Sequence, residues 1–123
     1  MPSEKQIQDT FDRVAQDIPG FIAASLVDLE SGMTLGARSL RSDFDLTAAS
    51  AYNSEMVKQK LKIMDVLGLH MDLEDMLLTL EEQIHLIRLI NKTTFLYLAA
   101  DRKGSNLAIV RNAVAQHIRE LTG

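Results

Sequence analysis

The stretch that decides the fold is IHLIRLINKTTFLYLAA, residues 84–100. It contains two strand-like runs, residues 84–90 and 94–100, which the turn residues Asn91-Lys92-Thr93 separate. In both runs the two alternating sets of side chains are largely apolar. An antiparallel sheet with one face in water would place polar residues in one of the two sets, so we expect helices on both faces of this sheet.

Three further strands are predicted on the N-terminal side of this stretch. Residues 76–81 form a third run, which makes a three-stranded meander with the first two. Residues 21–29 and 33–38 form a β-hairpin around the turn Leu29-Glu30-Ser31-Gly32. The chain therefore supplies five strands for one antiparallel sheet.

Three helices are predicted from apolar side chains that recur every three or four residues. The first covers about residues 3–18, where Ser3 and Gln6 have the spacing of a capping box and Pro19-Gly20 ends the helix. The middle one covers about residues 44–67 with Ser42 or Asp43 as its cap. The last covers about residues 105–121. The order is helix, hairpin, helix, meander and helix, which predicts an α/β fold, a three-layer α-β-α sandwich.

The amino-acid composition limits the classes of protein to which the chain can belong. The 123 residues carry 13 basic and 17 acidic side chains and no cysteine. The length fits a single domain spanning residues 1–123, and the net charge of -4 disfavours a nucleic-acid partner. The absence of cysteine excludes a disulfide framework and a thiolate zinc site. Since the N-terminus is polar and no apolar run approaches a membrane span, we expect a cytoplasmic protein with no direct membrane insertion.

Short motifs mark the junctions between these elements. Ile18-Pro19-Gly20-Phe21 leads into the first strand, and residues 28–32 make the first hairpin turn. Ala100-Asp101-Arg102, followed by Asn106-Leu107 and Val110-Arg111, leads from the last strand into the last helix. In this order and spacing the motifs resemble the Roadblock family of dynein light chains and bacterial GTPase regulators, over essentially the whole chain.

The resemblance implies a specific topology. The five strands would follow the order 2-1-5-4-3, with the middle helix on one face and the first and last helices on the other. It also implies a homodimer, joined through the middle helix and the third strand into one ten-stranded sheet.

No motif for catalysis or for metal binding is apparent. The six glycines nowhere form the phosphate-binding pattern G-x-x-x-x-G-K-[ST]. His70, His85 and His117 lack the short spacing that presents two ligands to one metal ion. We therefore expect neither an enzyme nor a bound cofactor or metal.

The middle helix carries the most information about interactions. Its apolar residues cover about half of the helix circumference, whereas one core contact requires a stripe of roughly 100°. Burial within the monomer is one explanation, and self-association is the other. Asn53 and Lys60 lie inside the apolar arc, where polar groups would need partners and could fix the register of a dimer. The candidate dimer interface, which includes the third strand, comprises Ala48, Ala49, Tyr52, Met56, Lys60, Ile63, Met76, Leu78 and Leu80.

Acidic residues gather between the middle helix and the third strand. Asp72, Glu74 and Asp75 precede Glu81 and Glu82, and no basic residue occurs between positions 72 and 82. These residues could dock a basic partner, or they could be a solvated segment that discourages non-specific strand pairing. We take Asp72, Glu74 and Asp75 as the candidate partner-binding residues.

The sequence predicts a homodimeric adaptor or regulator that acts through a binding surface and not through a reaction. The family resemblance implies a Ras-like small GTPase as partner, with hydrolysis stimulated through the GTPase's own groups, or else a larger scaffold assembly. A small-molecule sensor is the competing class. A pocket with convergent polar groups around His85, Arg88 and Tyr97 would favour the sensor.

Overall fold

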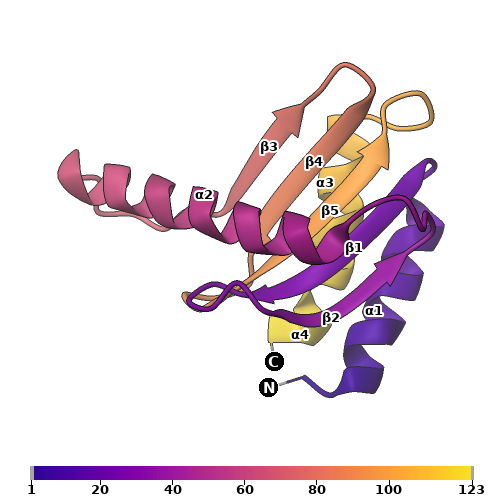
Figure 1. Ribbon diagram of the computed structural model, residues 1–123, viewed down its shortest axis with the longest axis horizontal. Helices are drawn as coiled ribbons and strands as arrows, with labels where there is room; N and C mark the ends of the chain where they lie inside the picture. Colours follow the sequence, from indigo (N-terminus) through magenta and orange to yellow (C-terminus); the bar gives the residue numbers. More distant parts are fainter. Residues whose placement is uncertain (1, 123) are drawn as a thin grey trace.

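The computed structural model describes residues 2–122 and places one sheet between two layers of helices (Figure 1). The expected order of elements is confirmed, with a short helix added at the end. Ile118 is the C-cap of α3 and separates it from the short helix, and the side chains of Ile118 and Leu121 are buried, so the last predicted helix packs on the sheet to its end. The elements are α1 (Glu4–Asp17), β1 (Phe21–Asp28), β2 (Thr34–Ser39), α2 (Leu46–Val66), β3 (Asp75–Thr79), β4 (Gln83–Leu89), β5 (Thr94–Asp101), α3 (Leu107–His117) and α4 (Arg119–Thr122).

The five strands form one antiparallel sheet in the order β2-β1-β5-β4-β3. This confirms the order implied by the Roadblock resemblance. Nearly all residues of the inner strands β1 and β5 are buried, whereas β2 and β3 are mostly half-buried. The two outer strands are the edges at which another chain could extend the sheet.

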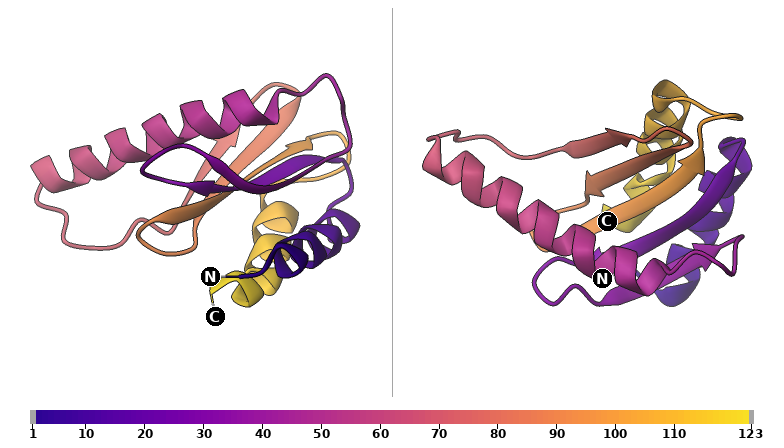
Figure 2. Two further views of the ribbon diagram at one scale, coloured as in Figure 1. Left: turned by 60° about the horizontal axis from the view of Figure 1, so that its bottom comes forward. Right: turned by 45° about the horizontal axis from the view of Figure 1, so that its top comes forward.

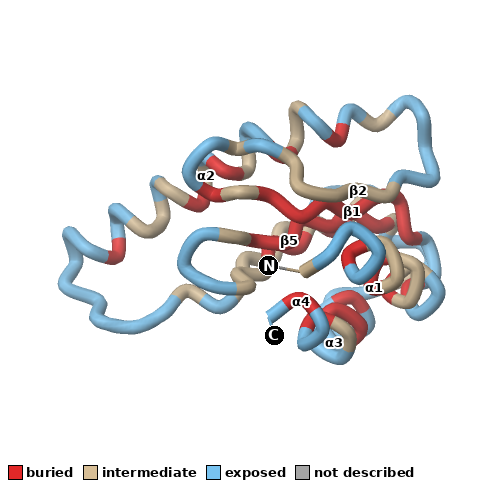
Figure 3. Tube along the Cα trace, turned by 90° about the horizontal axis from the view of Figure 1, so that it is seen from below, coloured by how far each residue is buried: buried red, intermediate tan, exposed pale blue. Residues whose placement is uncertain are grey.

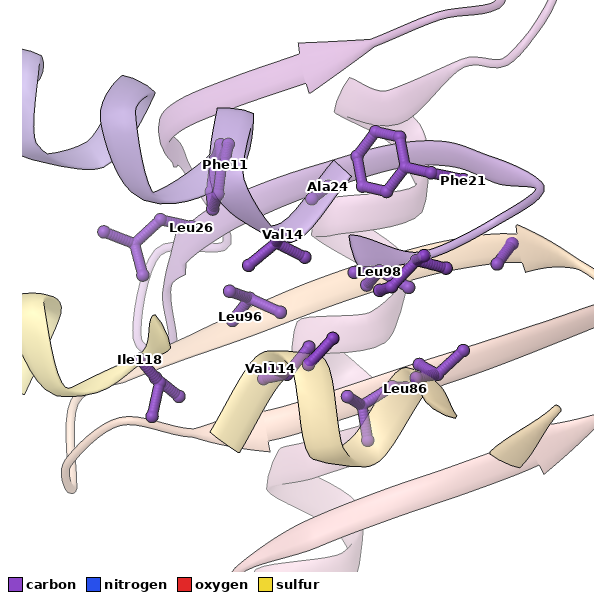
Figure 4. Packing of buried hydrophobic residues seen from close by; sticks show 14 of the residues in the cluster. Phe11, Val14, Phe21, Ala24, Leu26, Leu86, Leu96, Leu98, Val114 and Ile118 are labelled. Atoms are coloured by element: carbon purple, nitrogen blue, oxygen red, sulfur yellow. The ribbon is translucent and has the colours of Figure 1, made fainter. Parts of the chain in front are cut away.

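Helices cover both faces of the sheet, as predicted. α2 lies on one face, and α1, α3 and α4 lie on the other (Figure 2). The larger cluster of buried apolar side chains fills the space between the sheet and α1, α3 and α4, where Phe11, Leu96 and Val114 meet (Figure 4). A smaller cluster beneath α2 includes Val57 and Phe95.

The turn between α1 and β1 explains the Pro19-Gly20 pair. Gly20 has a φ of 81°, and a Cβ at this position would lie 3.1 Å from the carbonyl oxygen of Asp101. At the other end of α1, the backbone N–H of Gln6 donates to Ser3 Oγ at 3.1 Å. The Ser3 N–H in turn donates to the Gln6 side-chain oxygen at 2.7 Å, which completes the expected capping box. α1 is therefore fixed at both ends by the residues that the pattern predicts.

The cap of α2 differs from the expected one. Asp45, rather than Ser42 or Asp43, accepts a hydrogen bond from a backbone N–H of the first turn at 3.0 Å. The carboxylate of Asp43 is held instead by Arg41, whose Nε lies 3.2 Å from Oδ1. The prediction was wrong because the chain becomes helical only at Leu46, two residues later than expected, so that Asp45 is the residue whose carboxylate reaches an N–H of the first turn.

α2 covers its face of the sheet unevenly. It packs mainly on β1 and β2, and its C-terminal end extends beyond the strands (Figures 1 and 2). The residues of the edge strand β3, which lies beyond the part of the sheet that α2 covers, are mostly half-buried. The open side of α2 and the edge strand β3 therefore remain accessible together.

Candidate interaction surface

Five residues of α2, which we call the inner stripe, hold it on the sheet: Leu46, Ser50, Ser54, Val57 and Met64, all of them buried. The serine hydroxyls are hydrogen-bonded. Ser54 Oγ donates to the carbonyl oxygen of Leu29 at 2.6 Å. Ser50 Oγ donates to the carbonyl of Leu46 and lies 2.8 Å from Ser25 Oγ, which must be the donor of that pair. Small side chains and satisfied hydroxyls thus bring α2 close to β1 and fix its rotation.

A second set of α2 residues lies beside the inner stripe and is turned toward solvent. This outer stripe, Ala49, Tyr52, Met56, Lys60 and Ile63, contains five of the nine residues predicted for a dimer interface. Tyr52 is 78% exposed and Ile63 is 40% exposed. Ala49 and Met56 are half-buried against the cluster beneath α2, and Lys60 is half-buried. Tyr52 and Ile63 are therefore the apolar side chains of the outer stripe that the single chain leaves exposed.

The uncovered apolar surface continues past the predicted residues. Ala48, which was also predicted for the dimer interface, lies outside the outer stripe, about 100° around the helix from Ala49, and is half-buried. The prediction leaves out Val66, Leu69 and Met71, which are exposed at the end of α2 and in the segment after it. Their signal in the sequence is the run VLGLHM, residues 66–71, which stays apolar beyond the helix stop at Gly68. Figure 3 shows this end of α2 and the segment that follows as largely exposed.

The predicted residues of β3 lie on the same side of the sheet as α2. Met76 is paired with Ile87 and Leu78 with His85, and these partners belong to the strand positions that face α2. Met76 and Leu78 are half-buried, and Leu80, after the strand, is 45% exposed. The strand half and the helix half of the predicted interface therefore share one face and one edge of the molecule.

The three candidate partner-binding residues have different surroundings. Asp72 and Glu74 are exposed in the segment that connects α2 to β3. The Asp75 side chain is only 11% exposed, and its Oδ2 accepts hydrogen bonds from Arg111 Nε at 2.8 Å and from Arg88 at 3.4 Å. Asp75 thus ties the edge strand to β4 and α3. Asp72 and Glu74 are the members of the set whose carboxylates stand free for a partner.

The polar groups that would favour a sensor do not converge. His85 Nδ1 lies 3.2 Å from the Tyr97 hydroxyl, and His85 Nε2 lies 2.8 Å from the side-chain oxygen of Gln83. Burial lowers the pKa of His85, and burial raises the pKa of Tyr97 to about 12 against the opposing effect of a hydrogen bond with Asn53. Arg88 points to the other face of the sheet, toward Asp75. These three groups therefore line no common pocket.

A hollow of about 480 Å³ lies between the segment after α2 and the β4–β5 turn. Its lining combines apolar side chains with charged ones, including Arg88 and Lys92 on one side and Asp72 and Glu74 on the other. Within residues 2–122, no group of three or more histidine, aspartate or glutamate side chains is arranged to hold a metal ion. The mixed apolar and charged lining makes the hollow a candidate for an organic ligand or a peptide side chain.

A separate observation concerns membranes. Over the part of the chain that the structure describes, every helix is too short or too polar to span a bilayer.

The architecture defines the class of the protein. A Roadblock/LC7 domain from Streptomyces avermitilis superposes with a TM-score of 0.79 at 15% identity, covering 98% of this chain and 95% of that domain. This chain therefore has the Roadblock fold, as the resemblance implied. No family model matches the sequence, and no curated protein matches it.

Among solved structures of this fold, the chain is similar to MglB. The Myxococcus xanthus MglB structure has a TM-score of 0.84 and 17% identity, and the match covers 95% of this chain and 92% of MglB. A structure of MglB with a tetrameric arrangement has a TM-score of 0.84 and 13% identity, covering 97% of this chain and 87% of that one. At these identities the likeness shows the fold.

Proposed function

We propose that this protein is a homodimeric adaptor or regulator that binds a Ras-like small GTPase and modulates its GTP hydrolysis. The observation that carries the proposal is the apolar outer stripe of α2, which lies beside the free edge strand β3 on a Roadblock fold. In this proposal the protein acts by binding its partner and catalyses no reaction of its own.

The homodimer is supported by two features that a second copy would cover together. Exposed Tyr52 and Ile63 present apolar surface that a monomeric protein rarely leaves open as a continuous patch. β3 presents unpaired backbone groups at the edge of the sheet. A two-fold dimer satisfies both, because each copy offers the same helix and the same strand to the other. The tetrameric arrangement of MglB agrees with self-association of this fold.

The GTPase partner is supported by the resemblance to the Roadblock family, which includes bacterial GTPase regulators, and by the Roadblock fold of the chain. A regulator of this kind needs no catalytic residues, because holding the switch loops of the GTPase in place can supply catalysis indirectly. Asp72 and Glu74 are exposed carboxylates that would attract a basic surface of the partner. A larger scaffold assembly is the alternative partner.

The test is co-elution and phosphate release with each Ras-like GTPase of the same organism, in both nucleotide states and at low salt. We expect one GTPase to bind and its hydrolysis rate to change. The double variant Asp72→Asn and Glu74→Gln should weaken the complex with the GTPase. The control is the double variant Glu81→Gln and Glu82→Gln, which removes the same charge elsewhere and should weaken the complex less. If no GTPase binds in either nucleotide state, the proposed partner is wrong.

A small-molecule sensor is the second candidate, and the hollow of about 480 Å³ favours it, since ligand pockets typically have this size. A metabolite that raises the melting temperature by binding the folded chain would support this function. Leu89→Trp, which would fill the hollow, should then abolish the shift.

A further inference from the structure

Four polar side chains form a row in the layer between α2 and the sheet. They come from α2, β5 and β4, and we call them the polar row: Asn53, Tyr97, His85 and Gln83. The Tyr97 hydroxyl lies 3.2 Å from His85 Nδ1, and His85 Nε2 lies 2.8 Å from the side-chain oxygen of Gln83. Asn53 acts on the Tyr97 oxygen as a hydrogen-bond donor, since it opposes the rise in the pKa of Tyr97.

The direction of these hydrogen bonds is determined at the α2 end of the polar row. Asn53 Nδ2 donates at 2.7 Å to the carbonyl oxygen of Ala49, which can only accept, so the orientation of this amide is fixed. The second hydrogen of Nδ2 is then available for the Tyr97 oxygen. Tyr97 has one proton to donate, and its acceptor is His85 Nδ1. Neutral His85 therefore carries its proton on Nε2, from which it donates to Gln83.

A second proton on His85 disrupts this order. The proton would have to bind at Nδ1, where it meets the hydroxyl proton of Tyr97. The hydroxyl would then have to turn its proton away from the ring, while its oxygen accepts from Asn53 and from His85. Tyr97 is only 1% exposed, so water does not supply the acceptor that its displaced proton has lost.

The side chains that contact the His85 ring favour its neutral form. Phe44, from the segment before α2, and Tyr97 meet the ring edge-on, with ring centroids 6.5 and 5.5 Å away. The register partner of His85 on β3 is the apolar Leu78. These neighbours exclude water from the ring without offering an opposite charge.

Charged groups lie at the two ends of the polar row. At the β4 end, Asp101 of β5 is the register partner of Gln83, and its carboxylate lies 4.0 Å from Arg41. At the α2 end, Lys60 lies about two helical turns beyond Asn53. Burial alone lowers the pKa of His85, so these charges do not act on its ring.

The polar row connects α2 to strands that its other hydrogen bonds do not reach. α2 crosses the sheet (Figure 1) and packs mainly on β1 and β2. Within residues 2–122, its other side-chain hydrogen bonds to the rest of the chain end on β1 and on the turn after it, at Ser25, Leu29 and Glu30. Through Tyr97 and His85, the polar row extends the attachment of α2 to β5 and β4.

We infer that the polar row is a pH-sensitive switch: neutral His85 holds α2 on β5 and β4, and protonation of His85 releases this connection. Because α2 also carries the outer stripe, the switch determines how firmly exposed residues such as Tyr52 are held in place. The inference concerns the fold of one chain, so it can be tested without the homodimer and without the GTPase.

Nitrogen-15 NMR of the histidine rings tests the direction of the polar row. At neutral pH, His85 of the unsubstituted protein should carry its proton on Nε2. Tyr97→Phe removes the hydroxyl and keeps the ring, so the protonated imidazole no longer displaces a hydroxyl proton and the pKa of His85 should rise. If the hydroxyl instead accepts from His85, its removal lowers this pKa. A proton on Nδ1 at neutral pH, or a pKa in Tyr97→Phe that falls or stays the same, would overturn the inference.

Amide hydrogen exchange along α2 tests the release. As the pH falls through the titration of His85, protection of the α2 residues around Asn53 should decrease by about tenfold after correction for the intrinsic rates, as expected for a lost buried hydrogen bond. Protection of α1 and α3 should not change. In His85→Gln, which stays neutral, α2 should not respond to pH. His70→Gln removes an exposed histidine just after α2 and is the matched control, which should keep the response.

The remaining outcomes also decide the inference. Constant protection of α2 through the titration of His85, or the same decrease in His85→Gln, would contradict the switch. If His85→Gln fails to fold, Tyr97→Phe takes its place. In that variant α2 should already be less protected at neutral pH and should lose no further protection at low pH, whereas a decrease equal to that of the unsubstituted protein would overturn the inference.

Discussion

The two faces of the sheet are covered by helices of different character. On the face of α1 and α3, large side chains such as Phe11 and Val114 are almost completely buried. At the rim, Arg13 of α1 forms an ion pair with Glu120 of α4, and His117 Nε2 of α3 lies 2.6 Å from the carboxylate of Asp17 in α1. On the face of α2, small serines make the close contact, and apolar residues of the outer stripe remain exposed.

The difference indicates a division of roles. The face of α1 and α3 supplies most of the apolar core that holds a single chain together. The face of α2 fixes one helix by packing and hydrogen bonds and leaves a stripe for a partner. Substitutions on the first face should therefore change the stability of the fold, and substitutions in the outer stripe should change association.

The largest effect is expected at Phe11, which is fully buried between α1 and the sheet. Phe11→Ala should lower the free energy of unfolding by about 3–5 kcal/mol, because it removes apolar contacts and leaves a cavity. Urea denaturation followed by circular dichroism measures this. Lys5→Ala, on the exposed side of α1, is the control and should change stability by less than about 0.5 kcal/mol. A loss at Phe11 no larger than that of the control would show that this face does not hold the fold.

The next effect concerns association. Tyr52→Asp should convert the dimer to a monomer, because an unpaired carboxylate in an apolar contact costs several kcal/mol. Since Tyr52 is 78% exposed in the single chain, the fold should survive, as judged by circular dichroism. Lys62→Glu, on the exposed side of α2 away from the outer stripe, is the charge-changing control and should remain a dimer. A Tyr52→Asp dimer would mean that the interface lies elsewhere.

A smaller effect is expected where α2 meets β1. Ser50→Ala should cost about 1–2 kcal/mol of stability, because it leaves the buried hydroxyl of Ser25 without its acceptor. The double variant Ser25→Ala and Ser50→Ala should cost less than the sum of the two single variants, since neither hydroxyl is then left alone. Strictly additive losses in thermal unfolding would argue against this contact.

The smallest effect is a pH dependence at His85. Burial lowers the pKa of His85 in the folded chain, so the unfolded chain binds this proton more readily. Its contribution to stability is complete above the ordinary pKa of about 6.5 and is lost as the pH falls through the lowered value. The melting temperature should therefore decrease below about pH 6.5, and His85→Gln should reduce the decrease. An unchanged pH profile in His85→Gln would exclude His85 as its source.

The fold could be predicted from the sequence because its signals are local. Runs in which both alternating sets of side chains are apolar identified the buried strands β4 and β5, and the spacing of Ser3 and Gln6 identified the start of α1. The strand order came from the family resemblance and not from the pattern of residues. The cap at Asp45 was missed because Ser42, Asp43 and Asp45 are all residue types that cap helices, and the sequence pattern does not show at which of them the helix begins.

The surroundings of the candidate site could be predicted only in part. Asp75 is held by Arg88 and Arg111, which are 13 and 36 residues away, so no local pattern reveals this contact. The separation of His85 from Arg88, in contrast, was available from the sequence, since residues three apart on a strand point to opposite faces. The role of the outer stripe in a dimer stays a prediction until it is measured.

The most direct test of the account is the molar mass of the unsubstituted protein in solution, by light scattering over a dilution series. If a second copy covers the outer stripe and β3, the molar mass should be about twice 13.7 kDa at micromolar concentration. A mass of 13.7 kDa at every concentration, with the fold intact, would contradict this arrangement.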